Sequence, residues 1–106
     1  MTDFEELKLI VKFIKWKYNI NFKALANRIR SKALENARFK FIYLAKFYSH
    51  DNEDIGRFFK RSRESVYRAL QKINEDCKVY PEIKCEYTSI KDEYDSWRSN
   101  FNNANS

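Results

Sequence analysis

The chain has 106 residues, which is enough for one small domain with a single core. Apolar residues make up 43% and aromatic residues 17% of the chain, which excludes wholesale disorder. No uncharged apolar run reaches the roughly 18 residues that cross a membrane, and one glycine and one proline leave little turn chemistry for a multi-stranded sheet. We therefore expect an all-α fold, a compact bundle of about six helices over residues 1–99, followed by a disordered polar tail at 100–106.

The net charge of +6 is unevenly distributed along the chain. Residues 1–22 carry +1, residues 23–72 carry +8, and residues 73–106 carry −3. Cationic charge concentrated in the central fifty residues predicts a face that attracts a polyanion. The alternative on composition alone is a soluble basic protein with a solvated belt of charge.

Few residues are suited to catalysis or metal binding. The acidic N-terminus does not resemble a secretory signal, so a cytoplasmic, nucleoid-associated protein is expected. Cys77 and Cys85 are expected to be free thiols, with a disulfide between them as the alternative. The single histidine, His50, is expected in a loop. No catalytic triad, metal-ligand cluster or phosphate-binding loop is found, so we expect no enzymatic activity, no cofactor and no metal.

The first half of the chain contains three helical patterns. Residues 4–18 place their apolar side chains on one face, with lysines outside. A shorter helix is expected at 22–28, then a basic stretch at 28–32 as a loop or single turn, then a helix at 35–48. Arg38 lies near the start of that third helix. Because a helix N-terminus is positive, cations gathered there indicate an external anion.

The second half begins with two apolar-faced segments around a short basic break. The first is a short helix at 53–59, in which Gly56 indicates the close approach of another backbone. The second, at 63–78, repeats apolar residues at i, i+3, i+4 and i+7, and Ser62 is a good N-cap for it. A last helix is expected at 81–98, and its acidic exterior should lie away from a basic face.

A short helix, a tight turn and a longer helix are typical of a helix-turn-helix, whose second helix usually enters the major groove of DNA. Its outward side chains can reach phosphates and base edges. The sequence therefore predicts double-stranded DNA as the partner. The residues predicted to contact DNA from the turn and the second helix are Lys60, Arg61, Ser62, Arg63, Glu64, Ser65, Tyr67 and Arg68.

From residue 7 to 95 the chain resembles the C-terminal DNA-binding domain of the bacterial replication initiator DnaA. The resemblance is carried by IVKFIKWKYNINFKALANRIRSK, by ARFKFIYLAKFYSHDNEDIGRFFKRSRESVYRALQKI and by an acidic closing helix. That family has a basic loop, an arginine opening the helix that ends in Leu-Ala-Lys, an Ile-Gly in the next helix, and a signature Gly-Gly-Arg-Asp-His-Thr-Thr-Val. Here Arg38 precedes the Leu-Ala-Lys, Ile55 and Gly56 form the Ile-Gly, and residues 60–66 occupy the signature.

The resemblance implies a role for each matching residue. Arg38 would reach into the minor groove, and Arg61 with the helix start at Ser62 would engage the major-groove side, with Ser65 near a phosphate or base. The residues of the basic loop that would hold the DNA backbone are Arg28, Arg30 and Lys32. The signature departs from the family, because Ser-Arg-Glu replaces Asp-His-Thr and one glycine is absent. The sequence preference of the family therefore does not transfer.

Two functions follow. The first is a stand-alone DNA-binding protein that acts in replication or transcription control and is carried by a phage or mobile element, since the initiator's nucleotide-binding domain is missing from this sequence. SRESVYRAL alone also resembles recognition helices of site-specific recombinases and transcription regulators. The alternative function is a module that mimics the initiator domain and sequesters replication or transcription proteins. A contiguous patch of exposed aromatics would favour it, drawn from Trp16, Phe39, Tyr43, Phe47 and Tyr67.

Overall fold

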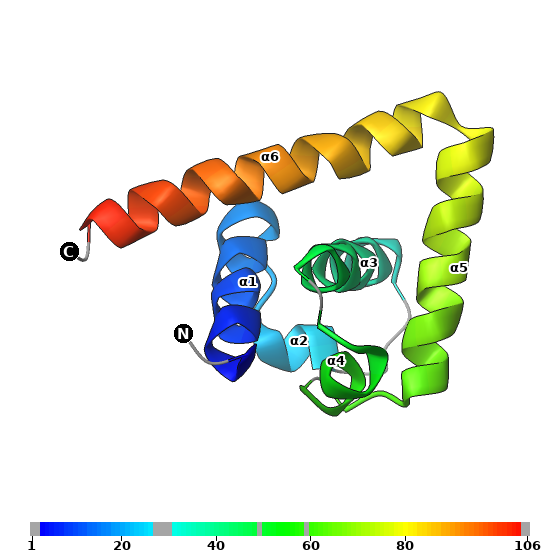
Figure 1. Cartoon of the computed structure of the whole chain (residues 1–106), viewed down its shortest axis with the longest axis horizontal. Helices are drawn as coiled ribbons and strands as arrows, with labels where there is room; N and C mark the ends of the chain where they lie inside the picture. The colour runs from blue at the N-terminus through cyan, green and yellow to red at the C-terminus, as the bar shows by residue number, and fades with distance from the viewer. Residues whose placement is uncertain (1–2, 27–30, 49, 59, 105–106) are drawn as a thin grey trace.

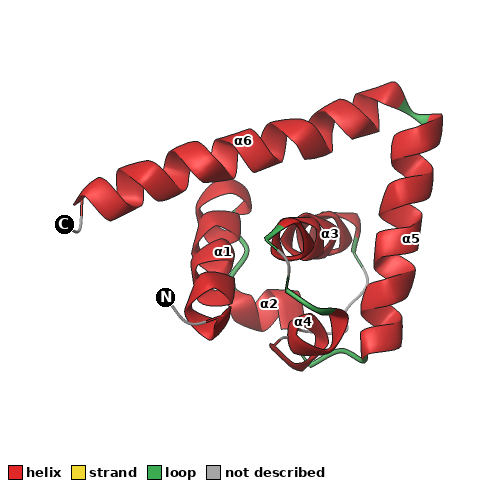
Figure 2. Cartoon of the chain, in the orientation of Figure 1, coloured by secondary structure: helices red, strands yellow, loops and turns green. Residues whose placement is uncertain are grey.

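A computed structural model describes residues 3–26, 31–48, 50–58 and 60–104. Within these ranges the chain forms six helices and no strand, so the all-α prediction is confirmed (Figure 1, Figure 2). The helices are α1 (Asp3–Tyr18), α2 (Phe22–Ala26), α3 (Lys32–Phe47), α4 (Asn52–Phe58), α5 (Arg63–Val79) and α6 (Pro81–Ala104). Across the described part of the chain, no helix combines the length and the apolar character needed to cross a bilayer.

Helix α3 lies at the centre of the bundle, between α1 and α5 (Figure 1). Helix α6 crosses over one side, and α2 and α4 close the other. Because all five other helices contact α3, its buried positions cover more than one face of the helix. Those buried positions are Ala37, Lys40, Phe41, Ile42, Leu44 and Ala45.

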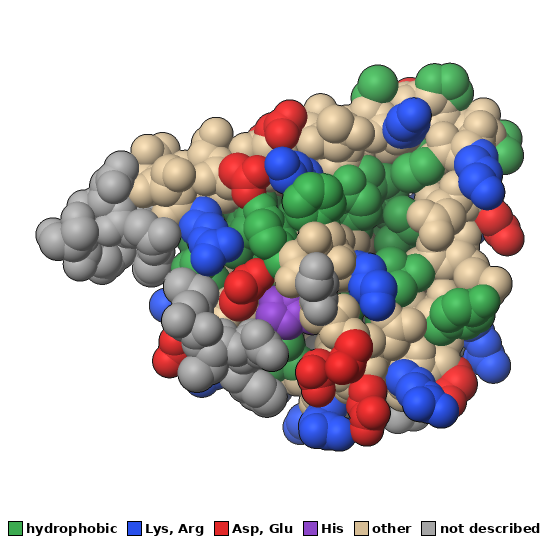
Figure 3. Space-filling view, viewed as in Figure 1, with side chains coloured by type: hydrophobic (Ala, Val, Ile, Leu, Met, Phe, Trp, Pro, Cys, Tyr) green, Lys and Arg blue, Asp and Glu red, His purple; other side chains and the backbone are tan. Residues whose placement is uncertain are grey.

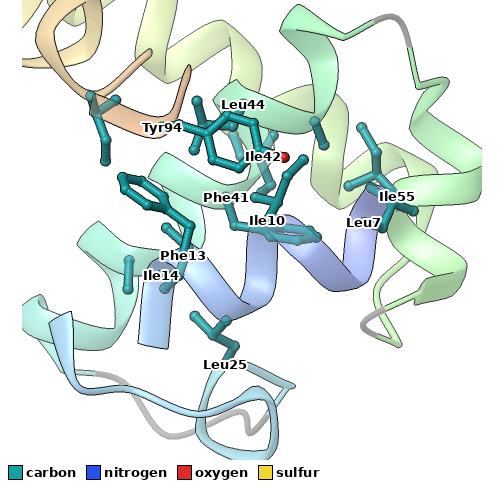
Figure 4. Packing of buried hydrophobic residues seen from close by; sticks show 14 of the residues in the cluster. Leu7, Ile10, Phe13, Ile14, Leu25, Phe41, Ile42, Leu44, Ile55 and Tyr94 are labelled. Carbon is teal, nitrogen blue, oxygen red and sulfur yellow. The ribbon is translucent and has the colours of Figure 1, made fainter. Parts of the chain in front are cut away.

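The core forms where the apolar face of α1 meets α3 and α6. Leu7, Ile10 and Ile14 are at most 1% exposed, as the periodicity of residues 4–18 predicts. Figure 4 shows these side chains interleaved with those of α3 and with Tyr94 of α6. Phe13 is also fully buried, and its ring centroid lies 5.3 Å from that of Tyr94. The long last helix is therefore held on the bundle by aromatic packing.

Helix α3 begins three residues earlier than predicted. The hydroxyl of Ser31 accepts a hydrogen bond from the backbone N–H of Leu34 at 3.1 Å, which makes Ser31 the N-cap. The prediction that Lys32 belongs to a basic loop is therefore wrong, because Lys32 is the first residue of the helix. Asp51 caps α4 in the same way, since its carboxylate accepts from the N–H of Asp54 at 2.8 Å.

Helix α6 is longer than predicted, because it continues past residue 98 to Ala104 and includes residues 100–104 of the predicted tail. Three of its acidic residues contact the bundle, although Glu86 and Glu93 remain exposed. Glu86 lies 2.9 Å from the ammonium of Lys40, Glu93 pairs with Lys17, and the hydroxyl of Tyr48 donates to Asp95. These carboxylates neutralise lysines of α1 and α3 and help to fix α6 on the bundle.

His50 lies in the loop between α3 and α4, as expected, but its side chain is buried with 5% exposure. The backbone N–H of His50 donates to the carbonyl of Ala45 at 3.2 Å, which turns the chain back under α3. The ring Nε2 lies 3.3 Å from Oε1 of Glu6, at ion-pair distance but without hydrogen-bond geometry. Helix α1 therefore lies against the connection between α3 and α4, and this contact buries the ring of His50 beside Glu6.

Cys77 and Cys85 are free thiols.

Candidate nucleic-acid interface

Helices α4 and α5 are joined by a turn that depends on Gly56. The N–H of Arg61 donates to the carbonyl of Gly56 at 2.7 Å, and Lys60 adopts a left-handed backbone with φ 61°. This combination of a left-handed residue and a 6→1 hydrogen bond is the Schellman arrangement that ends helices. A Cβ on residue 56 would lie 2.4 Å from the carbonyl oxygen of Arg61. The predicted close approach is confirmed, and the approaching backbone is that of the turn.

Helix α5 starts at the predicted cap. The hydroxyl of Ser62 accepts from the N–H of Ser65 at 3.1 Å. Val66, Ala69 and Ile73 are buried, so the inner face is the predicted one. The side chains on the opposite face are all exposed, and they are Arg63, Glu64, Ser65, Tyr67 and Arg68.

Exposed contacts along the start of α5 are weak. The Nε of Arg63 lies 3.4 Å from Oε1 of Glu64, and both side chains are more than 60% exposed. A backbone hydrogen bond, and then the neighbouring Arg63, lower the pKa of Glu64. Exposed pairs of this kind contribute little to stability. The guanidinium of Arg63 can therefore exchange Glu64 for another anion at small cost.

A groove between α3 and α5, with a volume of about 530 Å³, is lined by cations from three elements. Arg38 comes from α3, Arg61 from the turn, and Arg68 and Lys72 from α5, while Glu35 is the acidic residue among its lining side chains. Because like charges repel, a groove with this excess of cations favours binding of an external anion. We call these four residues the groove cations.

Arg38 is held in place by helix α2. Its Nε donates to the backbone carbonyl of Leu25 at 2.7 Å, near the C-terminal end of α2, where a cation is favourable. Burial, and then the charge of Arg61, lower the pKa of the Arg38 guanidinium. Arg38 was expected near the start of its helix, but it lies further in than predicted, because α3 begins at Lys32. The side chain reaches α2 because side chains on a helix tilt toward its N-terminus.

The structure brings some of the predicted residues together and separates others. Arg61, Ser62 and Arg63 also line a shallow groove of about 360 Å³ at the start of α5. Lys60 is exposed in the turn. Lys32 lies on the first turn of α3 and lines a different, smaller groove that it shares with Lys72. The predicted residues Arg28 and Arg30 lie outside the described residues.

Lys72 is on the predicted outward face of the second helix, although it was not among the residues assigned a contact with DNA. This lysine follows Arg68 by four residues on α5, which is the spacing that puts two side chains on one face of a helix. That spacing was a usable signal. What made Lys72 a groove residue, however, is the position of α3 alongside α5.

The comparisons with known proteins agree with this geometry. A family model described as "Bacterial dnaA protein helix-turn-helix" matches residues 7–73, from α1 to the middle of α5. The closing helix α6 lies beyond the match. No curated protein and no solved structure matches the chain. The match covers more than half of the chain, and the matched part contains α4, its turn and the start of α5. The chain therefore belongs to the bacterial DnaA helix-turn-helix family, a family of DNA-binding domains.

Proposed function

We propose that the chain reads duplex DNA by placing the first two turns of α5 in the major groove. An α-helix with its side chains is about 10–12 Å across, and the major groove is about 12 Å wide. The N-terminal end of α5 lies far from α6, which packs on the other end of α5 (Figure 1). The acidic α6 therefore does not cover residues 63–68, all of which except Val66 are exposed.

The observation that carries the proposal is the groove cations beside the start of α5. In this proposal Arg61, Arg68 and Lys72 hold one phosphate strand along the groove, while Arg38 extends toward the adjacent minor groove. Lys60 and the N-terminus of α5 at Ser62 contact phosphates at the other edge.

Base reading is assigned to the exposed side chains at the start of α5. Arg63 is the candidate for a bidentate contact with guanine, and Ser65 and Glu64 can accept or donate at neighbouring bases. Tyr67 already makes one hydrogen bond within the protein, because its hydroxyl accepts from the side-chain amide of Gln71 at 3.2 Å. The contact of Arg28 and Arg30 with the DNA backbone stays a prediction.

The experiment is selection of bound duplexes from a random pool, followed by anisotropy titrations at several salt concentrations. Arg63→Ala should lose about 1–3 kcal/mol of discrimination at one base pair. Lys72→Ala should weaken every duplex alike and reduce the slope of log K against log salt by about 0.9. Lys84→Ala, an exposed lysine of α6, is the matched control and should bind like the parent. If Arg63→Ala and Lys72→Ala also bound like the parent, the proposal would be wrong.

In the cell, we propose a role in control of replication or transcription, as an independent protein carried by a phage or mobile element. The alternative, a mimic that sequesters replication proteins, requires one contiguous aromatic patch. Tyr43 and Phe47 are neighbours, with ring centroids 6.4 Å apart, and both lie against α6, because Tyr43 packs on Tyr87 and the ammonium of Lys91 lies over the ring of Phe47. Figure 3 shows apolar side chains gathered between α3 and α6. Trp16 and Tyr67 lie on α1 and α5, on opposite sides of α3, and Phe39 lines the cationic groove. The predicted aromatics thus do not form one patch, and the DNA-binding function is better supported.

A further inference from the structure

Helix α1 carries a cationic and aromatic stripe on the face that points away from the core. The stripe consists of Lys8, Lys12, Lys15 and Trp16, at spacings i, i+4, i+7 and i+8, and all four side chains are exposed. The rise of about 1.5 Å per residue places them over about 12 Å of helix. We call these residues the α1 stripe.

The core does not require the α1 stripe. The opposite face of α1 is already buried against α3 and α6 through Leu7, Ile10 and Ile14. Trp16 is 66% exposed, and it rests against Phe13 with ring centroids 6.0 Å apart. Among the ion pairs of the described residues, none involves Lys8 or Lys15. A large exposed aromatic ring next to exposed lysines is therefore available to a ligand.

The shape of α1 argues against a membrane as that ligand. A helix that lies in a membrane surface buries its apolar face among the lipid chains. The apolar face of α1 is in the protein core, so among the described side chains of this helix Trp16 is the large exposed apolar group that could enter a bilayer. A single-stranded nucleic acid, in contrast, needs a line of cations for its phosphates and an aromatic face on which a base stacks. Duplex DNA offers the phosphates, but its bases are stacked inside and cannot cover Trp16.

We propose that the α1 stripe binds single-stranded DNA without sequence preference. Lys8 and Lys15 contact phosphates, and Trp16 stacks on a base. Helices α1 and α5 lie on opposite sides of α3 (Figure 1), so this surface is separate from the recognition helix. Such a protein can hold a duplex on α5 and an unpaired strand on α1 together. Binding of a single strand by itself does not depend on the proposed reading of duplex DNA, whereas its persistence beside a bound duplex does.

The experiment titrates the protein with (dT)12 at low salt and follows tryptophan emission. The Trp97→Phe variant leaves Trp16 as the single indole, and a phenyl ring can still pack on Phe13 and Tyr94. Saturable quenching of Trp16 is expected, and it should persist when a duplex already occupies the protein. In anisotropy titrations with labelled (dT)12, Trp16→Leu should weaken binding by at least about fivefold.

The paired substitution Lys8→Ala with Lys15→Ala should weaken (dT)12 binding and lower its salt slope by about 1.4. The matched control is Lys78→Ala with Lys84→Ala, which removes two exposed lysines from α5 and α6 and should bind like the parent. In the absence of duplex, three results would overturn the proposal. The first is that (dT)12 does not quench the emission of Trp16. The second is that the α1 variants bind (dT)12 like the parent. The third is that phosphatidylserine vesicles shift the emission of Trp16 to the blue while (dT)12 has no effect on it. Loss of quenching when duplex is bound would also overturn it, because the two surfaces would then be one.

Discussion

Replacing Gly56 by alanine tests the tight turn on which the helix-turn-helix depends. In a solvated helix the change stabilises, since alanine is favoured over glycine by about 1 kcal/mol. Here the added Cβ would lie 2.4 Å from the carbonyl oxygen of Arg61 and 3.2 Å from the carbonyl carbon of Ser62. Both neighbours are backbone atoms, so the turn itself has to move.

The cost can be estimated from the contacts that this movement disturbs. Overpacking typically destabilises by about 1–3 kcal/mol. Weakening the hydrogen bond from Arg61 N–H to the carbonyl of Gly56 costs about another 0.5–1.5 kcal/mol. After the gain of about 1 kcal/mol in helix propensity is subtracted, Gly56→Ala should lose roughly 0.5–3.5 kcal/mol of unfolding free energy. For a domain of this size each kcal/mol lowers the Tm by about 4–8 °C.

Urea unfolding, with an unchanged m-value, measures this loss. Ser89→Ala is the matched control, because Ser89 is exposed inside α6 and the change to alanine should be neutral or stabilise by up to about 0.5 kcal/mol. If Gly56→Ala were as stable as the parent or more stable, the gain in helix propensity would outweigh the steric cost of the added Cβ. The close contact between Gly56 and the turn would then be refuted.

Two further predictions concern the turn and the attachment of α6. Lys60→Gly should stabilise by about 1 kcal/mol in the same urea assay, because glycine adopts φ 61° without the strain that a lysine carries; a loss of stability would contradict the left-handed turn. Burial raises the pKa of Asp95, but hydrogen bonds from Tyr48 and Lys91 outweigh it, and the net pKa is lowered. A carboxyl with a lowered pKa stabilises the fold above its unfolded pKa and loses that effect as pH falls through the folded value. Stability should therefore decline below about pH 4, and Asp95→Asn should flatten the decline measured by thermal unfolding at a series of pH values.

The sequence by itself determined the elements that depend on local interactions. The 3.6-residue periodicity located the helices, and Ser62 marked the start of α5, because a cap bonds to a backbone N–H only three residues away. The Ser31 cap is equally local and was a missed signal, which misplaced Lys32. Gly56 indicated a close contact, although the sequence did not identify the backbone that approaches it.

The tertiary structure decided which charged groups meet. Arg38 bonds to the carbonyl of Leu25, His50 is buried beside Glu6, and Lys40 pairs with Glu86 forty-six residues away. Periodicity says which face of a helix is apolar, but it does not say which helix covers that face. The groove cations likewise depend on how α3 lies beside α5. Their positive charges come close together because the packing of α3 against α5 brings these helices side by side. Helix packing, rather than any local pattern, therefore concentrates the charge beside the recognition helix.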